Sequence, residues 1–363
     1  MSRSTTASGI VALLRAITSG RSDLPLSALT PAQAEWAVST GLAPLLHFHT
    51  QDDPRAATHP SFELVLGATL AAKAITSAQQ EAMREILDAG IGLSTVPTLL
   101  KGVSLRDQAY SQPYLRPMAD LDFLVAPDAI PDMLVTLQRL GYRPHSQHPA
   151  AFYEQHHHDM PLYHPGRDLM VEVHRGLFPA KSGLDEEVAF RRETVEAESE
   201  VSDLDGRPVL RLSRELQIVY LASHWAFELK VRHGNLLFAD LLCLWKTAAE
   251  FDWQKILGWL DNSVIASHLY LVLTYLNDRE ALSLDPALLE EIGKRQVACS
   301  PVTLRVLHRF IDRHVVDGRP FRFLIGTRNA EIAWHILLSH RRAPVNILRL
   351  PIGLLPGRPL SPQ

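Results

Sequence analysis

The chain has 363 residues, enough for two or three structural units around a large core. Hydrophobic residues make up 46% and charged residues 21%, which excludes a disordered or collagen-like chain. The net charge of −4 argues against a surface dedicated to nucleic acid, and two isolated cysteines exclude a disulfide framework and favour the cytoplasm. The absence of any run of about 18 uncharged apolar residues excludes a membrane span.

Residues 1–90 are expected to form an N-terminal helical region. Apolar residues recur at helical spacing in 10–17 and in 34–46, and a longer helical pattern covers 62–87. Gly90 then supplies a stop signal.

Residues 91–210 are expected to form a mixed α/β core. One helix is predicted to begin near Asp128, a good N-cap residue, and to end at Gly141 as its C′ residue. Short apolar runs that are typical of strands lie at 95–100, 121–125 and 169–173.

Residues 211–345 return to helical periodicity and are expected to form a C-terminal helical domain. Residues 346–363 contain several prolines, which predict an irregular tail. Helices are predicted at 215–230, 236–249 and 253–260. Further helices are expected to extend through residue 270 and to include 332–339.

Two aspartates in the core segment carry the most informative pattern. On an extended strand Asp120 and Asp122 project from the same face, about 6–7 Å apart along the backbone, while Leu121 and Phe123 point into the core. Two like charges at this spacing are unfavourable unless a cation lies between them, and their oxygens suit Mg²⁺ bound jointly with phosphates. The alternative is a pair of solvated residues on a half-exposed strand.

A basic and glycine-containing stretch precedes this pair. Lys101 and Gly102 close an apolar strand and open a short helix, so backbone amides can face a phosphate, although a simple turn is the alternative. Arg116 can reach a phosphate oxygen with its guanidinium fork, and the alternative is a surface ion pair with Asp107 or Asp128.

Seven histidines fall within residues 145–174, a density that suggests a transition metal. The spacing argues against it, because an extended backbone sends neighbours within 156–158 to opposite faces and no His-Glu-x-x-His motif is present. A histidine-ligated metallohydrolase is therefore only a third hypothesis. The histidines are His145, His148, His156, His157, His158, His164 and His174.

Two antiparallel strands are predicted at 158–164 and 169–174, joined by a Pro-Gly-Arg-Asp turn. In this register Glu172 and His174 share a face and Asp159 lies across from His174, a pairing that a one-residue slip would reverse. His174 is then expected to orient Glu172 or contact a substrate, or simply to be a hydrogen-bonded histidine at a strand end.

Several of these motifs together resemble the uncharacterised nucleotidyltransferase family of the DNA polymerase β superfamily. The resemblance covers roughly residues 93–260, including the appended helices. The motifs are Leu-Leu-Lys-Gly at 99–102, Tyr110, Arg-x-x-x-Asp-x-Asp-x-Leu-Val from Arg116, Leu-Gly-Tyr at 140–142, and Met-Val-Glu-Val-His at 170–174.

The resemblance implies an α+β fold with a small, mixed-sheet, polymerase β-like core flanked by N-terminal and C-terminal helical regions. It also implies that Asp120, Asp122 and Glu172 are the catalytic residues and metal ligands, with Glu172 helping to deprotonate or align the acceptor. Two metal ions are implied, Mg²⁺ or Mn²⁺.

The same resemblance places Lys101 and Gly102 against the triphosphate, where the wider superfamily has Gly-Ser. Arg116 is implied as a phosphate or structural contact, and His174 as a residue near the substrates. Tyr110 and Tyr142 are assigned to packing, and His224 and Asp240 to a structural pair that fixes the helical domain.

The implied activity is transfer of a nucleoside monophosphate from a nucleoside triphosphate, expected to be ATP, to an acceptor with release of pyrophosphate. The acidic net charge argues against long nucleic acid, leaving a small molecule, sugar, peptide or protein hydroxyl. The alternative is a non-catalytic nucleotide-binding or interaction module that keeps the fold.

Overall fold

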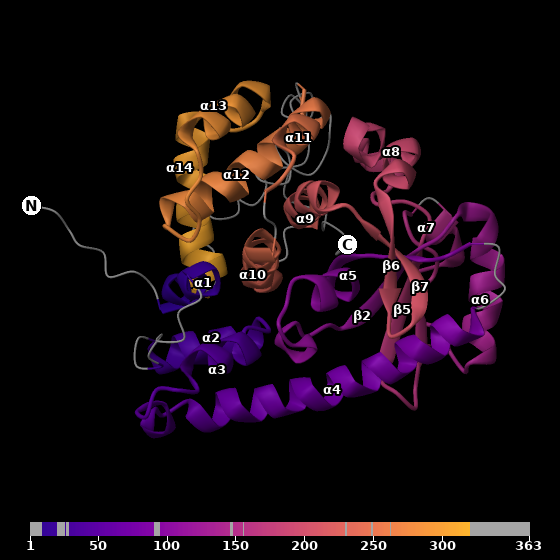
Figure 1. The fold of residues 1–363 in the computed structure, drawn as a ribbon, viewed down its shortest axis with the longest axis horizontal. Coiled ribbons are helices and arrows are strands. Elements are labelled where there is room, and N and C mark those ends of the chain that lie inside the picture. Colours follow the sequence, from indigo (N-terminus) through magenta and orange to yellow (C-terminus); the bar gives the residue numbers. More distant parts are fainter. Residues whose placement is uncertain are drawn as a thin grey trace, which may run out of the picture.

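The computed structural model describes residues 9–19, 26, 29–90, 95–145, 148–154, 156–228, 231–247, 250–261 and 263–319. The helix expected at 332–339 and the tail at 346–363 lie outside the described residues. Figure 1 shows the sheet on one side of the molecule, most C-terminal helices on the other, and the long helix α4 (Phe62–Ala89) running beneath both.

The described residues form a seven-stranded mixed sheet in the order β3-β4-β5-β2-β1-β7-β6. The pairs β2 with β5 and β1 with β7 are parallel, and the remaining neighbours are antiparallel. The expected α+β class is confirmed. The strands are β1 (Thr98–Leu99), β2 (Asp120–Leu124), β3 (Arg143–Pro144), β4 (Leu162–His164), β5 (Leu169–His174), β6 (Ser199–Leu204) and β7 (Arg207–Leu212).

Helices precede, interrupt and follow the sheet in the chain. The α-helices are α1 (Gly9–Ser19), α2 (Pro31–Ser39), α3 (Ala43–Thr50), α4, α5 (Lys101–Gln108), α6 (Ile130–Arg139), α7 (Ala150–Glu154), α8 (Arg192–Ala197), α9 (Arg214–Glu228), α10 (Val231–Thr247), α11 (Trp253–Trp259), α12 (Val264–Asp278), α13 (Pro286–Arg295) and α14 (Pro301–Phe310). Short 3₁₀ turns are η2 (Ala56–Thr58), η3 (Pro113–Leu115), η4 (Pro127–Ala129), η5 (Ala180–Ser182), η6 (Leu184–Glu186) and η7 (Val188–Phe190), and η8 (Ile311–Val316) is a π-helix.

Two expected helices differ in detail from the sequence pattern. The apolar pattern at 34–46 is divided between α2 and α3, because the chain turns at Gly41 with a φ of +82°. Asp128 is not the N-cap of α6, since it lies in the turn η4 and the helix begins at Ile130. Gly141 does follow α6 as predicted, with a φ of +96° and its amide bonded to the Gln138 carbonyl at 3.0 Å.

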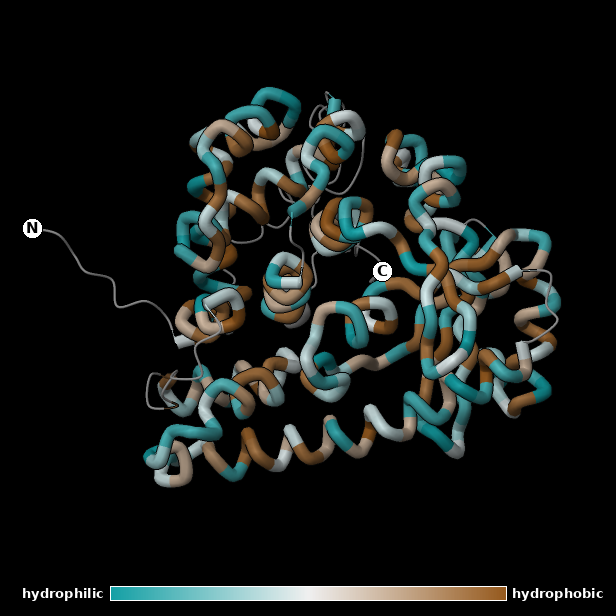
Figure 2. Tube along the Cα trace, viewed as in Figure 1, coloured by the Kyte–Doolittle hydropathy of each residue, from teal (hydrophilic) through white to brown (hydrophobic). Residues whose placement is uncertain are grey.

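Two hydrophobic cores organise these elements, and α4 contributes to both. One core joins helices from both ends of the chain, and α4 adds Val65 to it. The other lies against the sheet, where Met83 and Ile86 of α4 are buried together with Phe123 and Leu137. Figure 2 shows hydrophilic and hydrophobic residues alternating along α4, as expected of a helix with one buried face.

The N-terminal and C-terminal helices share the first core. The division of the chain at 90, 210 and 345 remains a prediction. Within the described part of the chain, no helix is both long enough and apolar enough to cross a bilayer.

Candidate active site

The carboxylates of Asp122 and Glu172 come together through strand pairing. Strands β2 and β5 run parallel, and their register places Asp122 directly beside Glu172 and Asp120 beside Met170. Leu121 on the opposite face is fully buried. Because side chains alternate along a strand, Asp120, Asp122 and Glu172 all project from one face, as the sequence pattern predicts for the two aspartates.

Asp122, Glu172 and His174 form a compact cluster. Their potential ligand atoms all lie within 4.8 Å of one another. His174 Nε2 lies 2.8 Å from Asp122 Oδ1 and 3.5 Å from Glu172 Oε2. Asp120 lies on the same face of β2 but is not part of this cluster. The structure therefore brings two of the three predicted carboxylates together with His174, which was also predicted to lie beside Glu172.

Lys101 completes the charge balance of this cluster. Its Nζ donates a hydrogen bond to Asp122 Oδ1 at 2.9 Å, so Lys101 and His174 both contact the same carboxylate oxygen. The side chain of Asp122 is only 3% exposed. A buried carboxylate is costly unless it is paired, and here two nitrogen donors pair with it.

These contacts shift the pKa values of Asp122, Glu172 and His174. Burial acts to raise the pKa of Asp122, but the Lys101 ammonium and the His174 hydrogen bond outweigh it and hold this pKa well below its usual value. Burial likewise opposes the charge on His174, yet its hydrogen bonds to Asp122 and Glu172 raise the pKa of this imidazole. The pKa of Glu172 is lowered despite burial, chiefly because of its hydrogen bond with His174. The cluster therefore favours ionised carboxylates facing cationic side chains.

The backbone at Lys101 and Gly102 brings the start of α5 close to these carboxylates. Lys101 has a φ of +47°, a left-handed conformation that favours glycine. A Cβ added to Gly102 would lie 2.9 Å from the Met118 sulfur and 3.3 Å from Cζ of Arg116. Glycine thus allows the first turn of α5, with its backbone donors, to approach the start of β2.

A cavity of about 330 Å³ opens at this point. Five of the predicted site residues line this cavity, whereas Glu172 and His174 do not. The predicted residues in the lining are Lys101, Gly102, Arg116, Asp120 and Asp122, and helices α9 and α10 add His224, Trp225 and Asp240.

The histidine-bearing strands pair antiparallel, as predicted, through β4 and β5. The residue across from His174 is His158, however, and not Asp159. An extra residue before β4, next to Pro161, forms a bulge and shifts the register by one. Asp159 instead accepts a hydrogen bond from Arg175 Nη2 at 2.8 Å.

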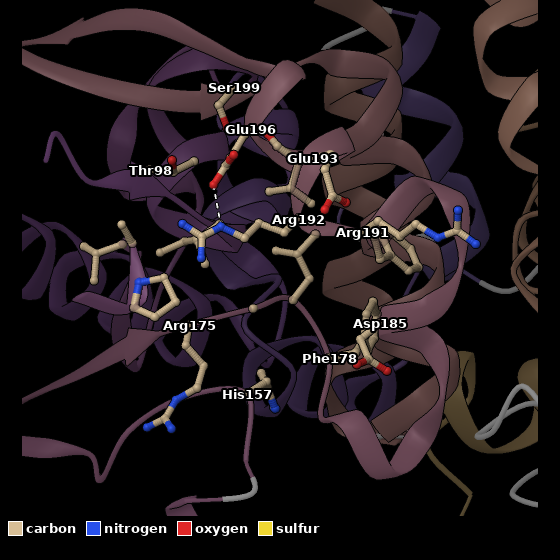
Figure 3. A pocket seen from close by; sticks show the side chains of 18 of the residues that line it. Thr98, His157, Arg175, Phe178, Asp185, Arg191, Arg192, Glu193, Glu196 and Ser199 are labelled. Atoms are coloured by element: carbon tan, nitrogen blue, oxygen red, sulfur yellow. Dashed lines mark hydrogen bonds and ion pairs between the residues drawn. The ribbon is translucent and has the colours of Figure 1, made fainter. Parts of the chain in front are cut away.

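The expectation that residues 156–158 alternate between faces is wrong. The chain bends at 156 and 157. The ring centroid of His156 lies 4.3 Å from that of His157 and also 4.3 Å from that of His158. His156 and His157 border a second cavity of about 870 Å³. Figure 3 shows His157 and Arg175 on one side of this cavity and Arg192 on the other. Asp120 and Asp122 line the smaller cavity and not this one, so the smaller cavity is the candidate active site.

The sequence comparison decides the family. A family described as uncharacterised nucleotidyltransferase matches residues 31–279, more than half of the chain. The chain belongs to this nucleotidyltransferase family. The resemblance stated from the motifs is therefore confirmed.

This member of the family is similar to a protein of known structure. It is an antigenic nucleotidyltransferase-like protein from Paracoccidioides brasiliensis, 15% identical, with 64% of this chain and 95% of that chain covered at a TM-score of 0.36. No curated protein matches the chain.

In this member of the nucleotidyltransferase family, Arg116 joins the loop before β2 to helix α10. Its Nε and Nη2 donate hydrogen bonds to the two carboxylate oxygens of Asp240 at 2.7 and 2.9 Å. The alternatives of an ion pair with Asp107 or Asp128 are therefore wrong. The Tyr110 hydroxyl also donates to Asp240, at 2.6 Å, so Tyr110 does more than pack.

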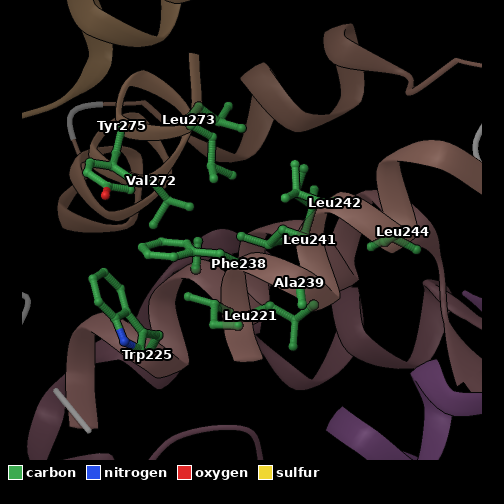
Figure 4. Packing of buried hydrophobic residues seen from close by; sticks show 14 of the residues in the cluster. Leu221, Trp225, Phe238, Ala239, Leu241, Leu242, Leu244, Val272, Leu273 and Tyr275 are labelled. Atoms are coloured by element: carbon green, nitrogen blue, oxygen red, sulfur yellow. The ribbon is translucent and has the colours of Figure 1, made fainter. Parts of the chain in front are cut away.

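Asp240 is held firmly because residues 237–244 of α10 around it are buried. Figure 4 shows Phe238, Leu241 and Leu242 of α10 packed close to Val272 and Tyr275 of α12. The structural role predicted for Asp240 thus involves Arg116 and Tyr110. The predicted partner, His224, lies on α9 and lines the same cavity. Tyr142 is buried, and its ring lies edge-on to His164.

Proposed function

We propose that the protein is a Mg²⁺-dependent nucleotidyltransferase that moves a nucleoside monophosphate from a nucleoside triphosphate, ATP in the first instance, to an acceptor hydroxyl. One observation carries the proposal: Asp122 lies beside Glu172 in register and is bonded to Lys101 at the start of α5. This combination supplies acidic metal ligands and a phosphate-binding helix start in one place.

The residues present fit divalent cations. Asp122 and Glu172 are ionised, adjacent and largely buried, and Asp120 projects from the same face. Oxygen ligands of this kind are those that Mg²⁺ prefers when it is bound together with phosphates. These three carboxylates would hold the metal, and two Mg²⁺ ions supply charge neutralisation for the attacking and leaving oxygens when bound.

The chain's own residues position the nucleotide. Lys101 and Gly102 at the start of α5 line the cavity together with Asp120, and there the Lys101 ammonium and the backbone donors of the helix start bind the triphosphate. Gly102 lets the start of α5 pack closely against Met118 and Arg116, because a Cβ there would lie 2.9 Å from Met118. Most of the catalysis is then positioning and electrostatics.

The chemical step is an in-line displacement. The acceptor oxygen forms a bond to the α-phosphorus, the bond to the bridging oxygen breaks, and pyrophosphate leaves with that electron pair. Glu172 accepts the acceptor's proton or aligns its hydroxyl. His174 holds the carboxylates of Glu172 and Asp122 in place through Nε2.

The acceptor class is a small molecule, sugar, peptide or protein, since the net charge of −4 argues against a long polyanion. A cytoplasmic location is proposed as well, and the two buried free thiols of Cys243 and Cys299 support it.

Mass spectrometry of cell extract incubated with isotopically labelled ATP tests the proposal. An acceptor should gain one nucleotidyl unit with the native protein and Mg²⁺, and lose that gain with Asp120→Asn or Glu172→Gln. The matched control is Asp128→Asn, an exposed aspartate just after the same strand, which should retain transfer. Tight ATP binding without any transfer would instead identify a non-catalytic nucleotide-binding module.

A further inference from the structure

Three consecutive histidines gather their rings at one point beside the larger cavity. The ring centroids of His157 and His158 lie 4.9 Å apart, and His156 lies 4.3 Å from each. The potential ligand nitrogens all lie within 4.8 Å of one another. An imidazole nitrogen binds Zn²⁺ at about 2.0–2.1 Å, so two ligands of one ion lie at most about 4 Å apart. The three nitrogens therefore lie close to the separation that ligands of one ion require.

The nitrogens of these rings are available to a ligand. Within the described part of the chain, the buried Nδ1 atoms of His156 and His157 have no hydrogen-bond partner. His157 is only 6% exposed, and an unsatisfied polar atom at such a buried position costs free energy. A metal ion is one of the few partners that would satisfy both nitrogens at once.

The third ring is oriented for the same purpose. Nδ1 of His158 lies 2.7 Å from the backbone carbonyl of Asp159, which can only accept a hydrogen bond. Nδ1 therefore carries the proton, and the lone pair of the neutral ring lies on Nε2. A backbone carbonyl that fixes the tautomer in this way is the usual outer contact of a metal-bound histidine.

The protonation of the rings agrees with this arrangement. Burial lowers the pKa of His156 to about 4 and lowers that of His157 further. Both rings are thus neutral at pH 7, which is the form that binds a metal.

We propose that His156, His157 and His158 form a binding site for one divalent transition-metal ion, with Zn²⁺ as its representative. This site adjoins the carboxylate cluster, since His158 Nε2 lies 3.9 Å from Glu172 Oε2. Nitrogen ligands favour such an ion over Mg²⁺, which prefers oxygen. His156 and His157 border the cavity of about 870 Å³, which leaves space for water as a further ligand. The ring of His174 lies 5.2 Å from that of His157, so the ion would brace the side of the carboxylate cluster.

The experiment measures metal binding directly and does not depend on nucleotidyl transfer. The full chain, purified without a histidine tag and stripped with a chelator, is titrated with Zn²⁺ and separately with Co²⁺ in excess Mg²⁺. We expect one equivalent of Zn²⁺ by elemental analysis and visible Co²⁺ absorption typical of imidazole ligands. Loss of a direct ligand should reduce affinity by more than the roughly 10–100-fold that loss of an outer contact costs.

The variants are His157→Asn and, as a more exposed second variant, His156→Asn. The matched control is His148→Asn, since His148 stacks on Phe152 in the same segment but is not one of the three rings. Both test variants should lose the equivalent of Zn²⁺ and the control should keep it. Native protein without stoichiometric Zn²⁺, or Zn²⁺ lost with Asp122→Asn but kept with His156→Asn, would overturn the proposal. Mg²⁺-dependent transfer is judged separately by the labelled-ATP experiment.

Discussion

Arg116 and Asp240 lie 124 positions apart in the chain and meet in a two-point ion pair at the edge of the candidate active site. Asp240 is almost completely buried, and the pair connects the loop before β2 with α10. Burial acts against the charge on Arg116, but the Asp240 carboxylate outweighs it and raises the pKa of the guanidinium. The pair therefore connects α10 to the side of the sheet that carries the candidate site.

Breaking this pair should destabilise the protein strongly. We expect Asp240→Asn to reduce the free energy of unfolding by about 3–5 kcal/mol, because Arg116 is left as an uncompensated buried charge. Urea unfolding measures the loss. The double variant Arg116→Met with Asp240→Leu should lose less than the sum of the single variants. The exposed Arg309→Gln is the control, and an equal loss there would show that burial of the pair is not the cause.

Lys101→Met should weaken triphosphate binding, and it should also lower the free energy of unfolding, because it removes one of the two nitrogen donors that pair with buried Asp122. A charge-assisted hydrogen bond contributes about 1.5–3 kcal/mol, so we expect roughly 10- to 150-fold weaker binding of a non-hydrolysable ATP analogue with Mg²⁺. Calorimetry measures the affinity, and circular dichroism checks the fold. Lys294→Met removes a lysine that is 61% exposed and should leave affinity unchanged. Unaltered affinity in Lys101→Met would remove this lysine from the nucleotide site.

Acid should destabilise the helical domain through His308. Burial lowers the pKa of this imidazole below its ordinary 6.5, more than the nearby Asp278 raises it. The unfolded chain then binds the proton more readily than the folded chain, so stability is complete above the unfolded pKa and declines as pH falls below it. Between about pH 7 and pH 5, His308→Gln should lose less stability than the native protein in urea unfolding. The exposed His145→Gln should follow the native protein, and parallel curves for all three would contradict the assignment.

Truncation on the sheet-facing side of α4 should be costly. Met83 is 1% exposed in the core against the sheet, and Met83→Ala should cost about 2–5 kcal/mol of unfolding free energy because it leaves a cavity. Leu70 on the same helix is 54% exposed, so Leu70→Ala should change stability by no more than about 0.5 kcal/mol. Equal midpoints of urea unfolding for both variants would show that α4 does not pack on the sheet in this way.

Local sequence patterns were sufficient to predict the parts of the site that lie within one strand or one turn. The period of two places Asp120 and Asp122 on one face, and the order of strand and helix places Lys101 and Gly102 at the start of α5. The position of Glu172 beside Asp122 depends on which strands are neighbours. Only the family resemblance indicated that pairing, because no local period encodes it.

Contacts between distant segments could not be predicted from spacing. Nothing near Arg116 in the sequence indicates Asp240 as its partner, since the fold alone brings α10 to this loop. The register shift at His158 had a usable signal in Pro161, which cannot donate to a sheet ladder and is typical of bulges. The bend that gathers the rings of 156–158 had no comparable signal, because histidine itself does not favour one backbone conformation.

The shared core of the two terminal regions also has a consequence for biosynthesis. Arg15 Nε donates to the carbonyl of Arg279 across 264 positions, and Trp36 Nε1 donates to that of Val315 across 279. The first helices therefore leave the ribosome long before their packing partners have been translated. During that interval their apolar faces stay exposed, so we expect chaperones to bind the nascent chain. A chain that terminates early would keep these faces exposed and would tend to aggregate.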